Sequence, residues 1–235
     1  MENITKKNQL FFDFGRDYDA ELTNFFFSKK NQVLKNELIE VIDSGRNKDI
    51  FISGKNGSGK TFLLNSLLNN EKLANKSNIY IDLSELDGSK DYFTGLNQFN
   101  LICLDNLDKI KEKIEVQVFN LINDCKQSST NLIFASSLNP SELLFLPDLI
   151  SRLKQINYFY INEISDEEVL DCIIFIVNKL NLNFSDDVME FISKRTRRDF
   201  SSIKRTIQDL EKFLYSEKKE PTKKTVSSFF SEYKN

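Results

Sequence analysis

Gly54-Lys55-Asn56-Gly57-Ser58-Gly59-Lys60-Thr61 decides the fold, because this stretch fits the P-loop pattern GxxxxGK[ST] in full. The apolar run 50–53 precedes it and a helical pattern over 62–68 follows, so the motif has the strand-loop-helix context that it requires. Glycines allow successive backbone N–H groups to surround an anion, and the positive end of the following helix adds to their effect. We expect Lys60 to reach the β- and γ-phosphates of a nucleotide and Thr61 to hold Mg²⁺. Phe62, directly after the motif, completes the expected cofactor-binding stretch.

A second motif follows at Leu101-Ile102-Cys103-Leu104-Asp105, an apolar run that ends in a carboxylate. The pattern indicates a buried strand with Asp105 at the carboxyl end of the sheet, where it can bind the hydration shell of Mg²⁺. The next residue is Asn106, whose carboxamide cannot accept a proton from an attacking water. We therefore expect slow hydrolysis by this chain itself. Asp108 is an alternative base that nothing in the spacing favours.

Composition excludes several classes of protein. The chain has 235 residues with 40% hydrophobic and 29% charged residues, which is typical of a soluble globular protein. It contains no histidine, so Ser-His-Asp and Cys-His catalysis are excluded. The three cysteines lack metal-ligand spacing. The net charge of -3 provides no general attraction to nucleic acid. We expect a cytoplasmic protein without a signal peptide or membrane association.

The pattern of apolar runs predicts an α/β fold with a parallel five-stranded sheet sandwiched by helices. The expected strands are 49–53, 78–83, 101–105, 132–136 and 156–161, and helical spacing predicts a helix over 111–126. After residue 161 the strand pattern stops. We expect a tail over 1–15, a base domain over 16–163 and a small all-helical lid domain over 164–235.

Four helices are expected in the lid. Ser165-Asp166-Glu167-Glu168 reads as a capping box that opens a helix to about residue 180. A second helix follows Ser185, and a third carries an apolar stripe from Phe200 to Leu214. Pro221 and Thr222 precede a short last helix.

Polar and basic residues near the expected strand ends are further candidates. Ser136 and Ser137 lie where a polar sensor of the γ-phosphate could lie, although serine is also common at strand ends. Arg152 precedes the fifth strand and could reach a neighbouring subunit's nucleotide, while a surface ion pair is the simpler interpretation. The cluster over 194–198 could be a solvated turn, a sensor arginine or a nucleic-acid patch; the acidic net charge makes the last the least favoured.

The stretch Gln9-Leu10-Phe11-Phe12-Asp13-Phe14 places four apolar residues near the N-terminus. An exposed apolar peptide of this kind suggests docking on another protein. Packing against the sheet as an edge strand is an equally good interpretation.

Together these motifs resemble the DnaA-related AAA+ family, and within it the Hda-like regulators of replication initiation. The resemblance runs from Gln9 to the last helix. By resemblance, Phe26, Phe27 and Asn31 line an adenine pocket, Arg198 is the sensor 2 arginine and Arg152 is an arginine finger acting in trans. The Asp105-Asn106 pair is similar to that of Hda-like proteins. Ser137 departs from the usual sensor 1 aspartate. Gln9, Leu10, Phe12 and Phe14 resemble a sliding-clamp-binding motif.

The resemblance implies a function. A protein of this kind binds ADP or ATP with Mg²⁺ and docks on the sliding clamp of DNA polymerase III, its β subunit. It then stimulates hydrolysis of DnaA-bound ATP, which is regulatory inactivation of DnaA. No helix-turn-helix pattern follows the lid, so we expect no sequence-specific DNA binding. A DnaC-like helicase loader and a non-enzymatic adaptor are the alternatives. Self-association to a homo-oligomer is left open.

Overall fold

The computed structural model describes residues 19–44 and 48–233. Within them a five-stranded parallel sheet has the order β2-β3-β4-β1-β5. The bounds are β1 Ile50–Ser53, β2 Asn78–Asp82, β3 Leu101–Asp105, β4 Asn131–Ser136 and β5 Asn157–Tyr160. The α/β fold with a parallel five-stranded sheet is therefore confirmed, with strand ends within one residue of those predicted.

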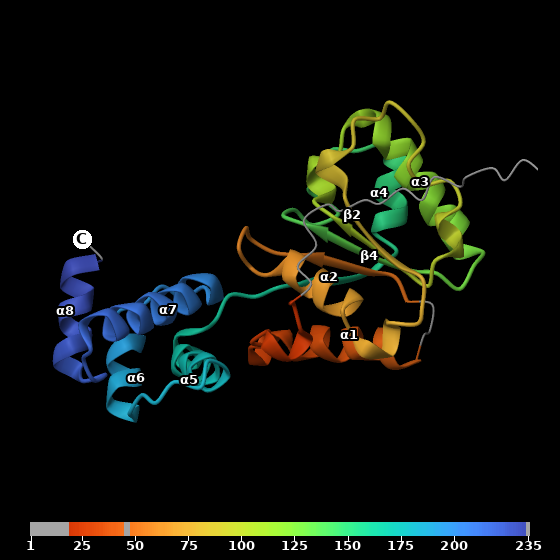
Figure 1. The fold of residues 1–235 in the computed structure, drawn as a ribbon. Coiled ribbons are helices and arrows are strands. Elements are labelled where there is room, and N and C mark those ends of the chain that lie inside the picture. The colour runs from red at the N-terminus through yellow and green to blue at the C-terminus, as the bar shows by residue number, and fades with distance from the viewer. Residues whose placement is uncertain (1–18, 45–47, 234–235) are drawn as a thin grey trace, which may run out of the picture.

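Helices cover both faces of the sheet (Figure 1). The helices α1 Gln32–Ser44 and α2 Lys60–Leu68 pack on one face, and α3 Glu112–Lys126 and α4 Pro147–Leu153 pack on the other. Side chains alternate across each strand. Ile50 and Ile52 join the core under α1 and α2, whereas Phe51 joins the core under α3 and α4. Both faces are buried, which explains why the strands read as continuous apolar runs.

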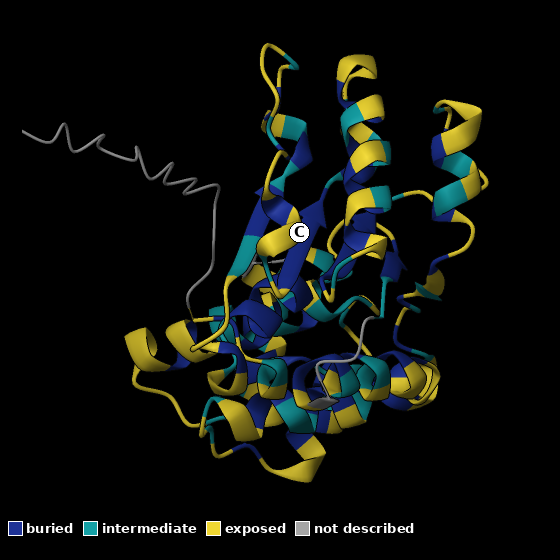
Figure 2. Ribbon diagram, turned by 90° about the vertical axis from the view of Figure 1, so that its right-hand side faces the viewer, coloured by how far each residue is buried: buried dark blue, intermediate teal, exposed yellow. Residues whose placement is uncertain are grey.

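The remaining helices form the lid. They are α5 Val169–Lys179, α6 Asp186–Ser193, α7 Phe200–Glu217 and α8 Lys223–Tyr233, and they enclose a separate apolar core. The expected capping box is present, since the Glu168 carboxylate accepts hydrogen bonds from the Ser165 hydroxyl at 2.7 Å and its N–H at 3.4 Å. Figure 2 shows the buried faces of the helices turned inward and their exposed faces turned to solvent.

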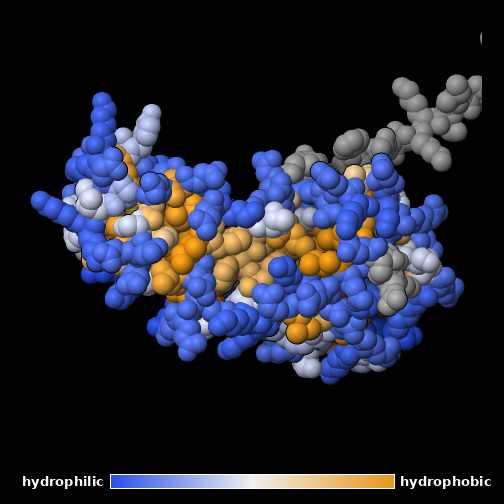
Figure 3. Space-filling model, turned by 90° about the horizontal axis from the view of Figure 1, so that it is seen from below, coloured by the Kyte–Doolittle hydropathy of each residue, from blue (hydrophilic) through white to orange (hydrophobic). Residues whose placement is uncertain are grey.

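The lid and the base make contact through the segment that precedes α1. The Phe26 ring packs against Phe175 of α5 with ring centroids 5.6 Å apart. The Lys29 N–H donates to the buried Glu168 carboxylate at 2.6 Å. Apolar side chains collect in a band between lid and base when the molecule is seen from below (Figure 3), over a groove of about 480 Å³. Within the described residues no helix is long and apolar enough to cross a membrane.

Candidate nucleotide site

The P-loop connects β1 to α2 at the carboxyl edge of the sheet. Its two inner glycines have left-handed backbones, with φ of 80° at Gly57 and 95° at Gly59. Nothing lies within 4 Å of the position that a Cβ would take at Gly57, but a Cβ at Gly59 would come 2.5 Å from Phe25 Cε2. Gly59 is therefore required both by its backbone conformation and by the close approach of an aromatic ring.

Lys60 lies over the loop at the first residue of α2. Its Nζ donates to the carbonyl of Gly54 at 2.6 Å and to that of Lys55 at 3.0 Å. Burial lowers the pKa of Lys60, and the nearby carboxylates of Asp105 and Asp108 oppose this effect only in part. The charged ammonium is thus held in a poorly solvated place, where a further anionic partner stabilises it.

Asp105 ends β3 and is 1% exposed. Its carboxylate accepts hydrogen bonds from the Thr61 hydroxyl at 2.5 Å, the Tyr80 hydroxyl at 3.0 Å and the Asn106 N–H at 2.7 Å. Burial, together with the charge of Asp105, raises the pKa of Tyr80. The structure therefore brings together the hydroxyl and the carboxylate that the sequence assigns to Mg²⁺. Oxygen ligands of this type suit that ion.

Asn106 has a left-handed backbone with φ of 55°. Its side-chain Nδ2 donates to both carboxylate oxygens of Asp82 at 2.9 Å, and its Oδ1 accepts from Lys109 Nζ at 2.9 Å. The carboxamide is thus engaged on both sides by charged partners. It is a structural link between the ends of β2 and β3, which is more than a turn-ending residue would provide.

Two serines contact the P-loop from other elements. The Ser137 hydroxyl, after β4, donates to Asn56 Oδ1 at 3.2 Å, and its N–H donates to Asp108 at 2.8 Å. The Ser201 hydroxyl, in the first turn of α7, donates to the Gly57 carbonyl at 3.1 Å. Residues that follow β4 and residues of the lid therefore both reach the loop.

Aromatic rings line the other side of the loop. Phe25 lies with its ring centroid 6.2 Å from those of Phe62 and Phe200, and 4.6 Å from that of Phe27. A small cavity of about 40 Å³ lies between Phe25, Phe26, Asn31, the P-loop, residues 161–164 and the start of α7. Two residues of the predicted adenine pocket, Phe26 and Asn31, thus line this cavity.

Phe27 and Asn31, in the segment before α1, also make contacts that hold the fold together. Phe27 is 9% exposed and joins the core under α1 and α2. Asn31 exchanges hydrogen bonds with the backbone of Asn162, donating to its carbonyl at 3.0 Å and accepting from its N–H at 2.9 Å. Asn31 therefore also fixes the chain where it leaves the base for the lid.

The two candidate arginines lie on different elements. Arg152, in the last turn of α4, is half-buried, and its guanidinium lies 5.8 Å above the centre of the Phe119 ring of α3. Among residues 19–44 and 48–233 no ion pair involves it. Arg198 is exposed and pairs with Asp166 at 2.5 Å, within the lid. Gln9, Leu10, Phe12 and Phe14 lie outside the described residues.

The chain is similar in sequence to known proteins. A family model described as RNA helicase matches residues 50–143, the part that holds the P-loop and Asp105. An uncharacterized protein of Haemophilus influenzae is 30% identical over 203 residues, which cover 83% of this chain and 86% of that protein. The chain therefore belongs to the same family as that protein.

Solved structures show the same fold. Domain III of the Thermotoga maritima replication initiation protein DnaA aligns with a TM-score of 0.76 at 19% identity, covering 92% of this chain and 98% of that one. AMPPCP-bound DnaA from Aquifex aeolicus aligns with a TM-score of 0.72 at 21% identity, over 84% of this chain and 66% of that one. The Thermotoga maritima RuvB motor aligns with a TM-score of 0.71 at 17% identity, covering 92% of this chain and 72% of that one.

The chain thus has the fold of DnaA domain III and of the RuvB motor. Within this fold, the structure adds residues to the site that the sequence motifs did not indicate, namely Tyr80, Asp82, Phe200 and Ser201. Asp82 could have been found, because it ends a predicted strand and parallel strands end at one edge. The others are placed by packing between distant segments.

Proposed function

We propose that this protein is a nucleotide-dependent regulator of replication initiation, in which bound ADP or ATP is structural and Arg152 acts on a second protein's nucleotide. The observation that carries the proposal is the contrast between two side chains. Asn106 is engaged by Asp82 and Lys109 in the chain's own site, whereas Arg152 lies on α4 over Phe119 without an ion-pair partner among the described residues. The chain thus offers an arginine that can act on another protein's nucleotide, while position 106 provides no base for its own site.

The residues present fit a nucleotide. Backbone N–H groups from Gly54 to Thr61 and the Lys60 ammonium would hold the phosphates, and the buried hydroxyl of Ser58 has no hydrogen-bond partner among the described residues. Thr61 and Asp105 would hold Mg²⁺, which neutralises phosphate charge when bound. No group of three metal-ligating side chains occurs in the described ranges, so the ion would depend on phosphate and water for its other ligands.

The adenine ring of the nucleotide would enter beside Phe25, Phe26 and Asn31, and Arg198 would approach the phosphates from the lid. The cavity there, about 40 Å³, is far below the roughly 300 Å³ of an ordinary ligand pocket. Binding therefore requires the start of α7 to move away from the P-loop. Ser201 contacts the P-loop, and Phe200 packs against Phe25 beside it. A bound nucleotide would therefore set the angle between the base domain and the lid domain.

Slow hydrolysis follows from the chemistry of Asn106. A carboxamide that donates two hydrogen bonds to Asp82 cannot take a proton from water. A guanidinium can instead stabilise the charge that develops on a phosphoryl group held by another subunit, and such arginine fingers raise rates by about 10³ to 10⁵. We infer that Arg152 does this for ATP held by DnaA.

The N-terminal motif supplies the location. Gln9, Leu10, Phe12 and Phe14 would bind the β-subunit sliding clamp of DNA polymerase III, so that stimulation of DnaA depends on replication having loaded the clamp. The resemblance of this hexapeptide to a clamp-binding motif supports this step. The protein would then act in the cytoplasm and prevent a second initiation.

The test is an ATPase assay of DnaA with clamp loaded on DNA, with and without this protein. We expect stimulation by wild type, loss of stimulation with Arg152→Ala or Gln9→Ala, and little change with Lys154→Ala, an exposed residue next to α4. Arg152→Ala should still bind nucleotide, which calorimetry checks. Stimulation that survives both Arg152→Ala and Gln9→Ala would remove the proposal. Rapid ATP turnover by this chain alone would favour a helicase loader.

A further inference from the structure

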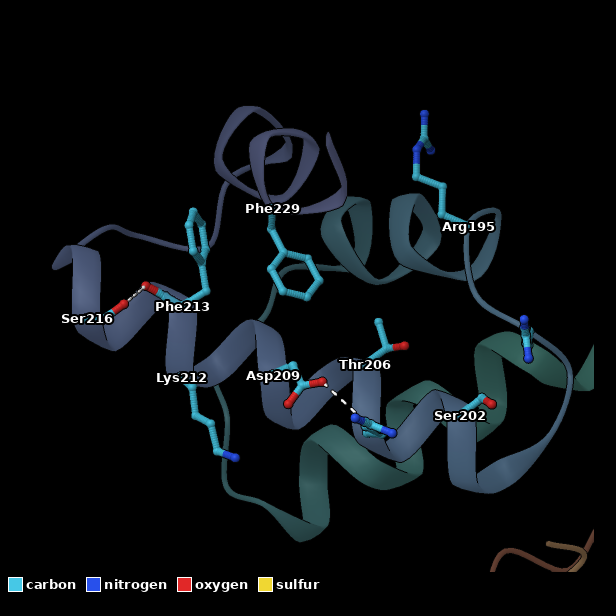
Figure 4. A pocket seen from close by; sticks show the side chains of 10 residues that line it. Arg195, Ser202, Thr206, Asp209, Lys212, Phe213, Ser216 and Phe229 are labelled. Carbon is cyan, nitrogen blue, oxygen red and sulfur yellow. Dashed lines mark hydrogen bonds and ion pairs between the residues drawn. The ribbon is translucent and has the colours of Figure 1, made fainter. Parts of the chain in front are cut away.

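A large cavity lies in the lid, away from the P-loop. It measures about 870 Å³ and lies along α7, between the loop over 194–199 and α8. Figure 4 shows its side chains arranged along α7, with Ser202 toward one end and Lys212 toward the other, and Phe229 of α8 facing Thr206. None of the nucleotide-site residues described above lines it.

The cavity is basic. Its lining includes Arg195, Arg197, Arg205 and Lys212, against the single acidic side chain of Asp209. This local excess arises because charge is segregated along the lid sequence. Residues 166–190 contain seven acidic and one basic side chain, whereas residues 194–212 contain seven basic and three acidic ones. The net charge of -3 therefore conceals a positive groove.

The cations of the groove are available to a ligand. Among the described residues no ion pair involves Arg195, Arg197 or Lys212, and the pair of Arg205 with Asp209 is 3.7 Å long and exposed. Arg195 stacks 3.5 Å from the centre of the Phe191 ring and donates to the Phe191 carbonyl at 3.1 Å. Stacking orients that guanidinium and leaves its other N–H groups to donate elsewhere.

The side chains that line the cavity favour the phosphate backbone of a nucleic acid over an acidic peptide as the ligand. The two aromatic side chains that line the cavity, Phe213 and Phe229, are 5% and 2% exposed. A docking peptide would therefore find no exposed aromatic ring among the lining residues to serve as an anchor. Three of the four cations are arginines, whose planar N–H groups match phosphate oxygens, and the Ser202 hydroxyl lies among them. Without an exposed ring the groove provides no platform for base stacking.

We propose that this groove binds the phosphate backbone of DNA without reading its sequence. The binding is independent of the nucleotide site and of Arg152, so it can be tested whether or not the regulatory role holds. Backbone binding releases counterions, so the affinity should fall steeply with salt. The three cations of the groove without an ion-pair partner among the described residues are Arg195, Arg197 and Lys212. If each contacts one phosphate, the slope of log K against log salt should be about -2.7 for duplex DNA and about -2.1 for single strands.

The test uses fluorescence anisotropy with the full chain and labelled 30-nucleotide single-stranded and duplex DNA of two unrelated sequences. At about 50 mM salt we expect equal affinity for both sequences, and at least tenfold weaker binding by the double variant Arg197→Gln/Lys212→Gln. Each single variant should reduce the salt slope by about 0.9 on duplex DNA, which a loss of folding would not reproduce. The difference between strands identifies which form is preferred.

The matched control is Lys76→Gln/Lys154→Gln, which removes the same charge from exposed positions on the base and should change affinity less than twofold. Equal binding by the groove variant and wild type would overturn the proposal, as would absence of binding at low salt. Binding of a polyglutamate peptide in place of DNA would assign the groove to a protein partner instead.

Discussion

Replacing Gly59 with alanine should destabilise the protein by about 2 to 4 kcal/mol. The left-handed backbone at φ of 95° costs an alanine roughly 1 to 2 kcal/mol. The new Cβ would also come 2.5 Å from Phe25 Cε2, so that ring must shift. Phe25 is 6% exposed and packs against three other rings, and aromatic contacts of this kind contribute about 0.5 to 1.5 kcal/mol each.

Gly57→Ala provides the matched control. Gly57 also has a left-handed backbone, with φ of 80°, but nothing lies within 4 Å of its Cβ position. Its substitution should therefore cost only the backbone term, about 1 to 2 kcal/mol. Denaturant unfolding of the nucleotide-free protein gives both free energies. For a chain of this length, Gly59→Ala should lower Tm by roughly 5 to 15 °C.

A double-mutant cycle with Phe25→Ala isolates the clash. That change alone should cost about 3 to 5 kcal/mol. In its background Gly59→Ala should cost no more than Gly57→Ala does, which gives a coupling of about 1 to 2 kcal/mol between positions 25 and 59. Equal effects of the two alanines, together with additivity in the cycle, would refute the assignment of Phe25 to the P-loop.

Three further perturbations test the site. Because burial lowers the pKa of Lys60, the charge of this side chain destabilises the folded protein at pH 7. Lys60→Met should therefore raise the Tm of the nucleotide-free protein in calorimetry, and this gain should shrink as pH rises through the lowered pKa toward 10.5. The same change should weaken Mg-nucleotide binding more than tenfold. Asn106→Asp should destabilise by about 2 to 4 kcal/mol, because the new carboxylate opposes that of Asp82, and Asp82→Asn should restore most of the loss. Burial alone would raise the pKa of Glu168, but hydrogen bonds from the Lys29 N–H and from Ser165 outweigh it and leave the pKa lowered. Glu168→Gln should therefore destabilise the protein by about 1 to 2 kcal/mol above pH 4.5. The difference from wild type should vanish as pH falls through the lowered pKa.

Each of these has an opposite outcome that would count against it. A fall in Tm with Lys60→Met at pH 7 would show that its bonds to the loop carbonyls outweigh desolvation. Unchanged stability of Asn106→Asp would show that the bonds of Asn106 to Asp82 contribute little to folding. A difference between Glu168→Gln and wild type that persists unchanged at pH 3 would show that the bond from Lys29 does not depend on ionisation.

Much of the fold could be predicted because its signals are local. The strand positions followed from apolar runs with turn residues on both sides, and the lid helices followed from capping residues and 3.6-residue spacing. Two base helices, α1 and α4, were not predicted. In α4 the signal was present, since Pro147 stands at the first helical position, but a helix of seven residues gives too little periodicity to recognise.

The sequence by itself determined that a loop with the P-loop pattern, Gly54 to Thr61, joins a strand to a helix, and that Asp105 ends a second strand. These are properties of consecutive residues, whose types set backbone freedom and charge. Only the tertiary structure decided which neighbours these groups meet. The bond of Thr61 to Asp105, the ring of Phe25 beside Gly59 and the engagement of Asn106 by Asp82 join residues between 24 and 44 positions apart. Such contacts depend on strand order and on packing between elements, which no stretch of sequence encodes alone.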